Sequence, residues 1–187
     1  RGLTMPADNS DKSASKSVGK SVGKSSGKSA GKSANKSDGR LRLRAASASD
    51  VEVLSTLLQD AIIPGEDMVF DRATRRFVMV ANRFCWDRPA VDGVTSDTGA
   101  PVYERQLCGI QIHNVDKVRT SAMPTPRQGV LLNLLAITAS DAADGAVVDL
   151  LFSGGVTMRL DAESLLILAE DLDAGHPTAN LPSHADS

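Results

Sequence analysis

A β-hairpin encoded between Gly145 and Asp161 constrains the fold of this chain more than any other stretch. Apolar residues recur at every second position on both sides of the turn sequence at 153–155, Ser-Gly-Gly. A hydrophobic period of two predicts strands with one buried face, and the two glycines can adopt the positive φ angles of a tight turn. The expected inward-facing residues are Val148, Leu150, Phe152, Val156, Met158 and Leu160.

Charge divides the chain into a basic N-terminal tail and an acidic body. Residues 1–39 carry eight basic and three acidic side chains, a formal charge of +5, whereas the remainder carries thirteen basic and twenty acidic ones, a formal charge of −7. In the tail a Lys-Ser pair recurs every four residues from Lys12 to Lys36, with too little apolar surface to support a fold. We expect a disordered tail over 1–39, one globular domain over 40–175, and a polar C-terminal tail over 176–187.

The body shows the patterns of an antiparallel sheet with one packed helix. Ser49 and Glu52 have the spacing of a capping box, and the apolar spacing that follows predicts a helix from Asp50 to Ile62. Strand patterns cover 41–45, 68–71, 76–86, 107–113 and 130–138, and an extended stretch continues to 123. Residues 76–86 are apolar on both faces, which favours a central strand, and the continuous apolar run at 130–138 favours the middle of the sheet.

Residues 163–172 fit either a strand or a helix. Strong helix formers favour a short helix, with Asp161 available as its cap. The expected fold class is therefore α+β: a curled or partly barrel-like antiparallel sheet of about six to eight strands, one packed helix and a possible short C-terminal helix. The alternative architecture is a barrel of the pleckstrin-homology type closed by the terminal helix.

The connection at 87–104 is rich in Pro, Gly, Asp and Thr and lacks hydrophobic periodicity. It is longer than an ordinary connection between strands, which has about 4–6 residues. Long loops are either mobile insertions or parts of binding sites. We expect a mobile insertion at 87–104.

The sequence offers no catalytic constellation. It lacks His-Glu-x-x-His, and both Gly-x-Ser-x-Gly and Gly-Lys-Ser occur only in the tail repeat, where the sequence pattern predicts no preceding strand and no following helix. His113 is expected to be structural, and the acids at 141, 144, 170, 171 and 173 are expected on solvated turns or ends. We therefore expect no catalytic residue, no metal and no cofactor, and an enzymatic function is uncertain but disfavoured.

The two cysteines indicate the cellular compartment in which the protein is expected. Cys85 and Cys108 lie in apolar stretches without metal-ligand spacing, which favours reduced thiols over a disulfide and a cytoplasmic location. No apolar run has the roughly 18 residues of a membrane span, so no membrane association is expected.

A group of arginines on an otherwise acidic body is the one candidate binding site. Guanidinium groups brought together can hold a phosphate or a carboxylate. The alternative is that they pair with surface acids and keep an edge strand soluble. The residues of this candidate anion site are Arg72, Arg75, Arg76, Asn82, Arg83 and Arg88.

Three short motifs carry a family resemblance. They are Arg-Arg-Phe at 75–77, Asn-Arg-Phe-x-Trp at 82–86 and Phe-x-Gly-Gly-x-x-x-Arg-Leu at 152–160. Over residues 41–178 the chain resembles an uncharacterised alphaproteobacterial family of domains of unknown function; the insertion at 87–104 and the tail depart from its pattern. The resemblance implies a bacterial, cytoplasmic, single-domain protein and brings no catalytic residue with it.

These observations favour a non-enzymatic binding or interaction module over two alternatives. Ample apolar sheet surface without a catalytic constellation supports an interaction module, whose partner would be a protein or a small anion. The first alternative is an anion binder or small enzyme that uses the arginine cluster. The second is nucleic-acid association through the basic tail, which the acidic body itself disfavours.

Overall fold

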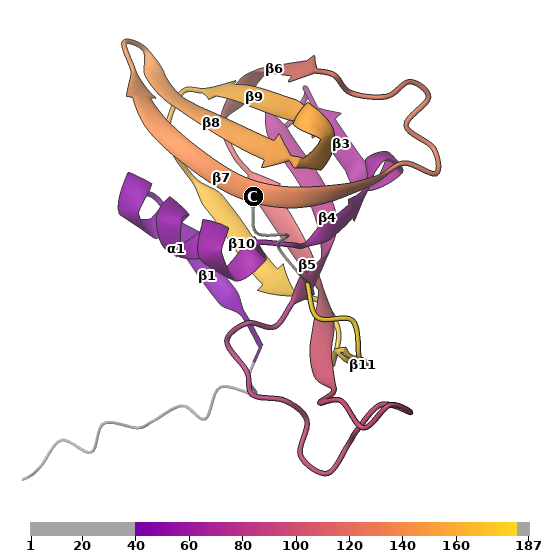
Figure 1. The fold of residues 1–187 in the computed structure, drawn as a ribbon. Coiled ribbons are helices and arrows are strands. Elements are labelled where there is room, and N and C mark those ends of the chain that lie inside the picture. Colours follow the sequence, from indigo (N-terminus) through magenta and orange to yellow (C-terminus); the bar gives the residue numbers. More distant parts are fainter. Residues whose placement is uncertain (1–39, 183–187) are drawn as a thin grey trace, which may run out of the picture. The chain divides into compact units, whose positions relative to one another are not determined.

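The computed structural model of the protein describes residues 40–182, which form one antiparallel sheet and one α-helix (Figure 1). The helix, α1, spans Ala48–Leu58. The strands are β1 (Arg42–Ala45), β2 (Ile62–Pro64), β3 (Met68–Asp71), β4 (Arg76–Phe84), β5 (Tyr103–Ile112), β6 (Val115–Ser121), β7 (Leu131–Ala142), β8 (Gly145–Phe152), β9 (Thr157–Ala162), β10 (Ile167–Asp171) and β11 (His176–Thr178). The predicted repeat tail lies outside the described residues.

The sheet follows the order β1-β10-β5-β4-β2-β7-β8-β9-β6, with β3 added to β4 and β11 added to β5. It curls so that β7, β8 and β9 cross over β10, β5 and β4, and α1 lies beside β1 and β7 (Figure 1). The sheet is not closed, because β6 and β1 end the order without pairing with each other. The core fills the space inside the curl, where Leu54, Met79, Ile110, Leu150 and Met158 are all fully buried.

The hairpin predicted from the sequence is confirmed as β8 and β9. Leu150 lies opposite Met158, and every predicted inward-facing residue is at most 5% exposed. Between the strands, residues 153–155 form a 3-10 turn (η2) in which Gly154 and Gly155 have φ angles of 72° and 75°. A residue with a Cβ atom rarely adopts such φ angles, so the turn requires glycine at these two positions. The expected place of the run at 130–138 is also confirmed, since β7 lies between β2 and β8.

The number of strands was underestimated: the described residues form eleven strands instead of six to eight. Two of the strands that were not predicted, β2 and β11, have three residues each. Such segments are too short for a period of two to stand out from the surrounding loops. β11 also places three residues of the expected polar C-terminal tail in the sheet, where His176 lies opposite Arg105.

The short C-terminal helix favoured over 163–172 is wrong, and with it the alternative of a barrel closed by a terminal helix. Residues Ile167–Asp171 form β10, which is hydrogen-bonded between β1 and β5. Ile167, Ala169 and Asp171 are buried while Glu170 is exposed, which is the alternation of a strand. Pairing with a neighbour on both sides overrides the helix propensity of this sequence.

The helix is confirmed, with boundaries that differ from the expected ones. Ser47, and not Ser49, is its N-cap: the Ser47 hydroxyl accepts a hydrogen bond from the Asp50 amide at 3.2 Å, and the Asp50 carboxylate accepts one from the Ser47 amide at 3.0 Å. The capping-box spacing occurs twice in the sequence, in Ser47 with Asp50 and in Ser49 with Glu52, and the first of these pairs caps the helix. The helix ends at Leu58 because Asp60 adopts a φ of 62° and Ile62 already pairs with β7.

The remaining strands follow the sequence patterns closely. β4 pairs with β5 on one side and with β2 and β3 on the other, as expected for a central strand. The extended stretch to Met123 is a separate strand, β6, because Asn114 turns the chain with a φ of 58°. β5 begins at Tyr103, so the connection after β4 ends at Val102, whose carbonyl accepts a hydrogen bond from the Val91 amide at 2.7 Å. Mobility of this connection stays a prediction.

Candidate functional site

The six residues of the predicted anion site lie at the two ends of β4 and do not converge. Arg72, Arg75 and Arg76 lie in or beside the turn between β3 and β4, whereas Arg83 and Arg88 lie at the opposite end. Arg83 lies seven residue steps beyond Arg76 along β4, roughly 23 Å at the usual rise per residue. The two ends are therefore separate environments, and anion binding by all six residues together stays a prediction.

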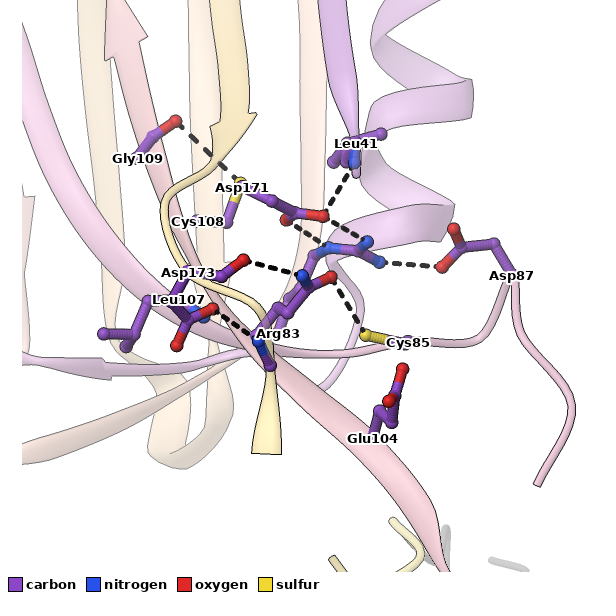
Figure 2. A network of polar contacts seen from close by, with 12 residues as sticks. Leu41, Arg83, Cys85, Asp87, Glu104, Leu107, Cys108, Gly109, Asp171 and Asp173 are labelled. Atoms are coloured by element: carbon purple, nitrogen blue, oxygen red, sulfur yellow. Dashed lines mark hydrogen bonds and ion pairs between the residues drawn. The ribbon is translucent and has the colours of Figure 1, made fainter. Parts of the chain in front are cut away.

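Arg83 lies at the centre of a buried ion-pair network (Figure 2). Its side chain is 0% exposed; Nε and Nη2 donate to the two carboxylate oxygens of Asp171 at 2.8 Å each, and Nη1 donates to Asp87 at 2.8 Å. Burial favours the neutral guanidine, but the hydrogen bonds with Asp171 and Asp87 outweigh it, so the pKa of Arg83 is raised. An external anion would have to displace one of these carboxylates to reach Arg83.

Asp171 was expected on a solvated acidic end, and this expectation is wrong. The residue is 3% exposed and receives a further hydrogen bond at 2.7 Å from the Leu41 amide, just before β1. Arg88 extends the network by donating to Glu104 at 2.7 Å (Figure 2 shows Glu104 beside the network). The network thus joins β4, β10, the start of β1 and the loop after β4, which indicates a structural function for this end of the cluster.

The two cysteines adjoin the same network and are both free thiols. The Cys85 thiol lies 3.7 Å from the Gln106 side-chain oxygen, and Cys108 lies 3.9 Å from the Gly109 carbonyl (Figure 2). Burial raises the pKa of Cys108 to about 12 and also raises the pKa of Cys85. A thiol reacts as its thiolate, so neither cysteine is activated for nucleophilic chemistry.

At the other end of β4, Arg75 joins two parts of the sheet. It has a φ of 53°, and its carbonyl accepts a hydrogen bond from the Val115 amide at 2.9 Å. Its guanidinium donates to Asp116 at 2.6 Å and to Glu163 at 2.8 Å. A register shift between β6 and β9 leaves Asp116 without a partner residue in β9. Arg75 therefore holds the turn between β3 and β4 against the first residues of β6.

A slot lies between β3 and β6 beside this contact. It is a cavity of about 410 Å³ that is partly open to solvent. We call it the β3–β6 slot, and its lining residues are Phe70, Arg72, Arg75, Val115, Asp116, Lys117 and Val118. β3 pairs only with β4 and β6 pairs only with β9 among the described residues, so each strand has an edge that pairs with no other strand (Figure 1). Residues of both strands line the slot.

A second cavity lies beside Arg105 of β5, a residue that the sequence analysis did not select. Arg105 is 9% exposed; Nη1 donates to the carbonyls of Asn82 at 3.0 Å and Asp60 at 3.3 Å. Its Cζ atom lies 5.6 Å from the centroid of the Phe84 ring, a cation–π distance. We call this cavity, of about 280 Å³, the Arg105 pocket; it is lined by Asp60, Ile62, Arg105, Leu131, Leu132, Asn133 and Pro182.

His113 occupies a structural position between β5 and β6. Its amide donates to the Leu166 carbonyl at 2.9 Å, and its Nε2 atom is buried without a hydrogen-bond partner among residues 40–182. Burial, with a smaller contribution from Arg76, lowers the pKa of His113, so the neutral imidazole is favoured. Within residues 40–182, no three His, Cys, Asp or Glu side chains are placed to hold a metal ion.

Sequence reasoning missed Arg105, Lys117 and Asp171. Arg105 stands between Glu104 and Gln106, and no neighbouring arginine indicates a basic cluster there. Lys117 is the only lysine in the sequence outside the tail repeat, so it belongs to no charge pattern. Asp171 lies 88 residues from its partner Arg83. Only the pairing of β10 with β5, and of β5 with β4, brings these two residues together.

Comparison with known proteins identifies a family without an assigned activity. A family model described as "Protein of unknown function (DUF2948)" matches residues 41–184. No curated protein matches the chain, and no solved structure matches it either. In the part of the chain that the structure describes, no helix has the length and apolar character needed to span a membrane.

Proposed function

The chain belongs to the DUF2948 family of proteins of unknown function, and we propose that it is a non-enzymatic interaction module that binds an extended acidic segment of a partner protein in the β3–β6 slot. The observation that carries this proposal is a cavity of about 410 Å³ beside two free strand edges, with basic side chains in its lining. The side chains that could serve as a nucleophile or a base are Cys85, Cys108 and His113. They are buried or half-buried, and their environments favour the neutral forms.

The free edge of β6 supplies the backbone groups for recognition. An unpaired edge presents alternating amides and carbonyls to which an extended peptide can add as a further strand. β6 is seven residues long, which is roughly 23 Å at the usual rise per residue. An edge of that length allows several main-chain hydrogen bonds with a partner segment.

The charges around the slot select an acidic segment. Arg75 is neutralised by Asp116 and Glu163, whereas Arg72 and Lys117 form no ion pair with the described residues. These two cations stand out on a body whose formal charge is −7 from residue 40 onward. Carboxylates on the incoming segment would pair with them, and the acidic body would repel a partner that approached elsewhere.

The apolar side chains of the slot supply the contact area. Phe70 and Val118 are partly buried and pack against the core, and both line the slot. In an added strand successive side chains point to opposite sides. A segment in which acidic and apolar residues alternate therefore places its apolar side chains toward Phe70 and Val118.

The proposal is tested with a labelled seven-residue peptide in which Glu alternates with Val, matching β6 in length. Fluorescence anisotropy should show salt-sensitive binding that the double variant Arg72→Glu, Lys117→Glu weakens about thirtyfold, because two attractive pairs of about 0.5 kcal/mol each become repulsive by a similar amount, a change of about 2 kcal/mol. The matched control is Arg127→Glu, an exposed arginine outside the slot. Equal binding by the double variant and the wild type, or an equal loss in the control, would refute the proposal.

Two other hypotheses remain predictions with tests of their own. Anion binding by the arginine cluster predicts that phosphate stabilises the wild type but not the Arg72→Ala, Arg76→Ala double variant. Nucleic-acid association through the tail predicts salt-sensitive binding of single-stranded DNA that is lost on deletion of residues 1–39. We also propose that residues 40–175, extended by β11, form a single folded domain and that the protein is bacterial and cytoplasmic; the two free thiols support the cytoplasmic location.

A further inference from the structure

We infer that the Arg105 pocket binds a small monocarboxylate with a short apolar body. The pocket shares no lining residue with the β3–β6 slot, so this inference is independent of the proposed protein interaction.

Arg105 is a buried cation to which no carboxylate of residues 40–182 is hydrogen-bonded. The hydrogen bonds that its guanidinium makes to the described residues all use Nη1 and reach two backbone carbonyls, those of Asn82 and Asp60. Arg83, at the same end of β4, instead uses three nitrogens to bind two carboxylates. Removing a guanidinium from water is costly unless an anion compensates for the lost hydration. An anion in the pocket would supply that compensation to Arg105.

Electrostatics support an uncompensated charge at Arg105. Burial lowers the pKa of Arg105, and the attraction of the Asp60 carboxylate only partly opposes that effect. For Arg83 the balance is reversed, since its carboxylate partners raise the pKa despite complete burial of the side chain. The two arginines thus differ in how fully the protein neutralises them, and the less neutralised one lines a cavity.

The surroundings hold Arg105 in place. The Phe84 ring lies on one side of the guanidinium, and Trp86 packs against Phe84 with ring centroids 4.5 Å apart. The Trp86 indole donates to the Gln59 carbonyl at 3.1 Å, which joins this aromatic pair to the segment before Asp60. The positive φ of Asp60, 62°, accompanies the contact of its carbonyl with Arg105. A guanidinium fixed in this way is pre-organised for a planar carboxylate.

The size and lining of the pocket define the ligand class. Its volume of about 280 Å³ is below the range of about 300–1,000 Å³ typical of drug-sized ligands, so the ligand is small. Ile62, Leu131 and Leu132 provide apolar walls for a short hydrocarbon chain. One guanidinium with the Asp60 carboxylate nearby suits a single negative charge, and it disfavours doubly charged phosphate by repulsion.

The test compares butyrate with its neutral isostere butyramide, and with inorganic phosphate, on the full-length protein. Titration followed by amide chemical shifts should show saturable butyrate binding, with butyramide and phosphate at least about tenfold weaker. Arg105→Met should remove the preference for butyrate over butyramide. Equal binding of butyrate and butyramide, or no saturable butyrate binding up to about 100 mM, which leaves less than about 1.4 kcal/mol of binding free energy, would overturn the inference.

A second variant keeps the test decisive if Arg105→Met fails to fold. Leu131→Trp enlarges a side chain that is 68% exposed and lines the pocket, so it should block the pocket without disturbing the core. The matched control is Leu135→Trp on the same strand, at a position that is 43% exposed and outside the pocket lining. Loss of butyrate binding in Leu131→Trp alone supports the inference, and retention of full binding by Leu131→Trp contradicts it.

Discussion

Replacement of Asp171 by alanine should destabilise the domain far more than replacement of its sequence neighbour Glu170. Asp171→Ala leaves the fully buried Arg83 guanidinium without its bidentate partner and the Leu41 amide without its acceptor. Breaking a buried ion pair from one side typically costs about 3–5 kcal/mol. Glu170 pairs with Arg42 on the surface, where both side chains are more than half exposed, and such pairs contribute about 0–1 kcal/mol.

The assay is urea denaturation followed by circular dichroism, with thermal melts in parallel. A loss of about 3–5 kcal/mol should lower the melting temperature by roughly 6–20 °C for a domain of this size, whereas Glu170→Ala should change it by only a few degrees. The double variant Arg83→Met, Asp171→Leu removes both buried charges and should recover most of the lost free energy of unfolding. If Asp171→Ala and Glu170→Ala have equal melting temperatures, Arg83 is not a buried cation that depends on Asp171.

Two further predictions concern His113 and Gly145. The pKa of His113 is lowered in the folded state, so the unfolded chain binds more protons below its own pKa of about 6.5. The stability that depends on neutral His113 is therefore present above about pH 6.5 and lost as the pH falls below it. His113→Gln should make the free energy of unfolding less dependent on pH between about pH 7 and 5. Gly145→Ala should destabilise more in thermal melts than Gly99→Ala. Both glycines have positive φ, but a Cβ atom at Gly145 would lie 2.2 Å from the Ala162 carbonyl oxygen while one at Gly99 meets open space. Equal melting temperatures would count against this backbone packing.

The parts of the fold that sequence reasoning predicted are those determined by local pattern. β8 and β9 carry both a hydrophobic period of two and the Gly154-Gly155 turn, so each strand and its connection have separate signals. α1 was likewise predicted from a local pattern, its apolar spacing and its capping box. Its first residue was misplaced because Ser47 and Ser49 offer the same capping pattern. Boundaries depend on which of two equivalent caps the tertiary structure uses, and the sequence contains both.

The parts that were missed depend on pairing between distant segments. The helix formers at 163–172 are overridden because Ile167–Asp171 fits between β1 and β5. Closeness along the chain suggested that Arg76 and Arg83 act together, but an extended strand places them at opposite ends. Of the predicted anion-site residues, Arg72 and Arg75 line the β3–β6 slot, while Arg83 lies in an internal ion-pair network with Asp171 and Asp87.

The central claim, strand addition at the β3–β6 slot, is tested most directly by amide hydrogen exchange with and without the Glu-Val peptide. We predict slower exchange at the free-edge amides of β6 that follow Val115, whose own amide already donates to the Arg75 carbonyl, and in the adjoining residues of β3, with β1 and β10 unchanged. The Arg72→Glu, Lys117→Glu variant should lose this protection. Unchanged exchange in β6 when the peptide is bound, or protection confined to the opposite end of the sheet, would contradict the account.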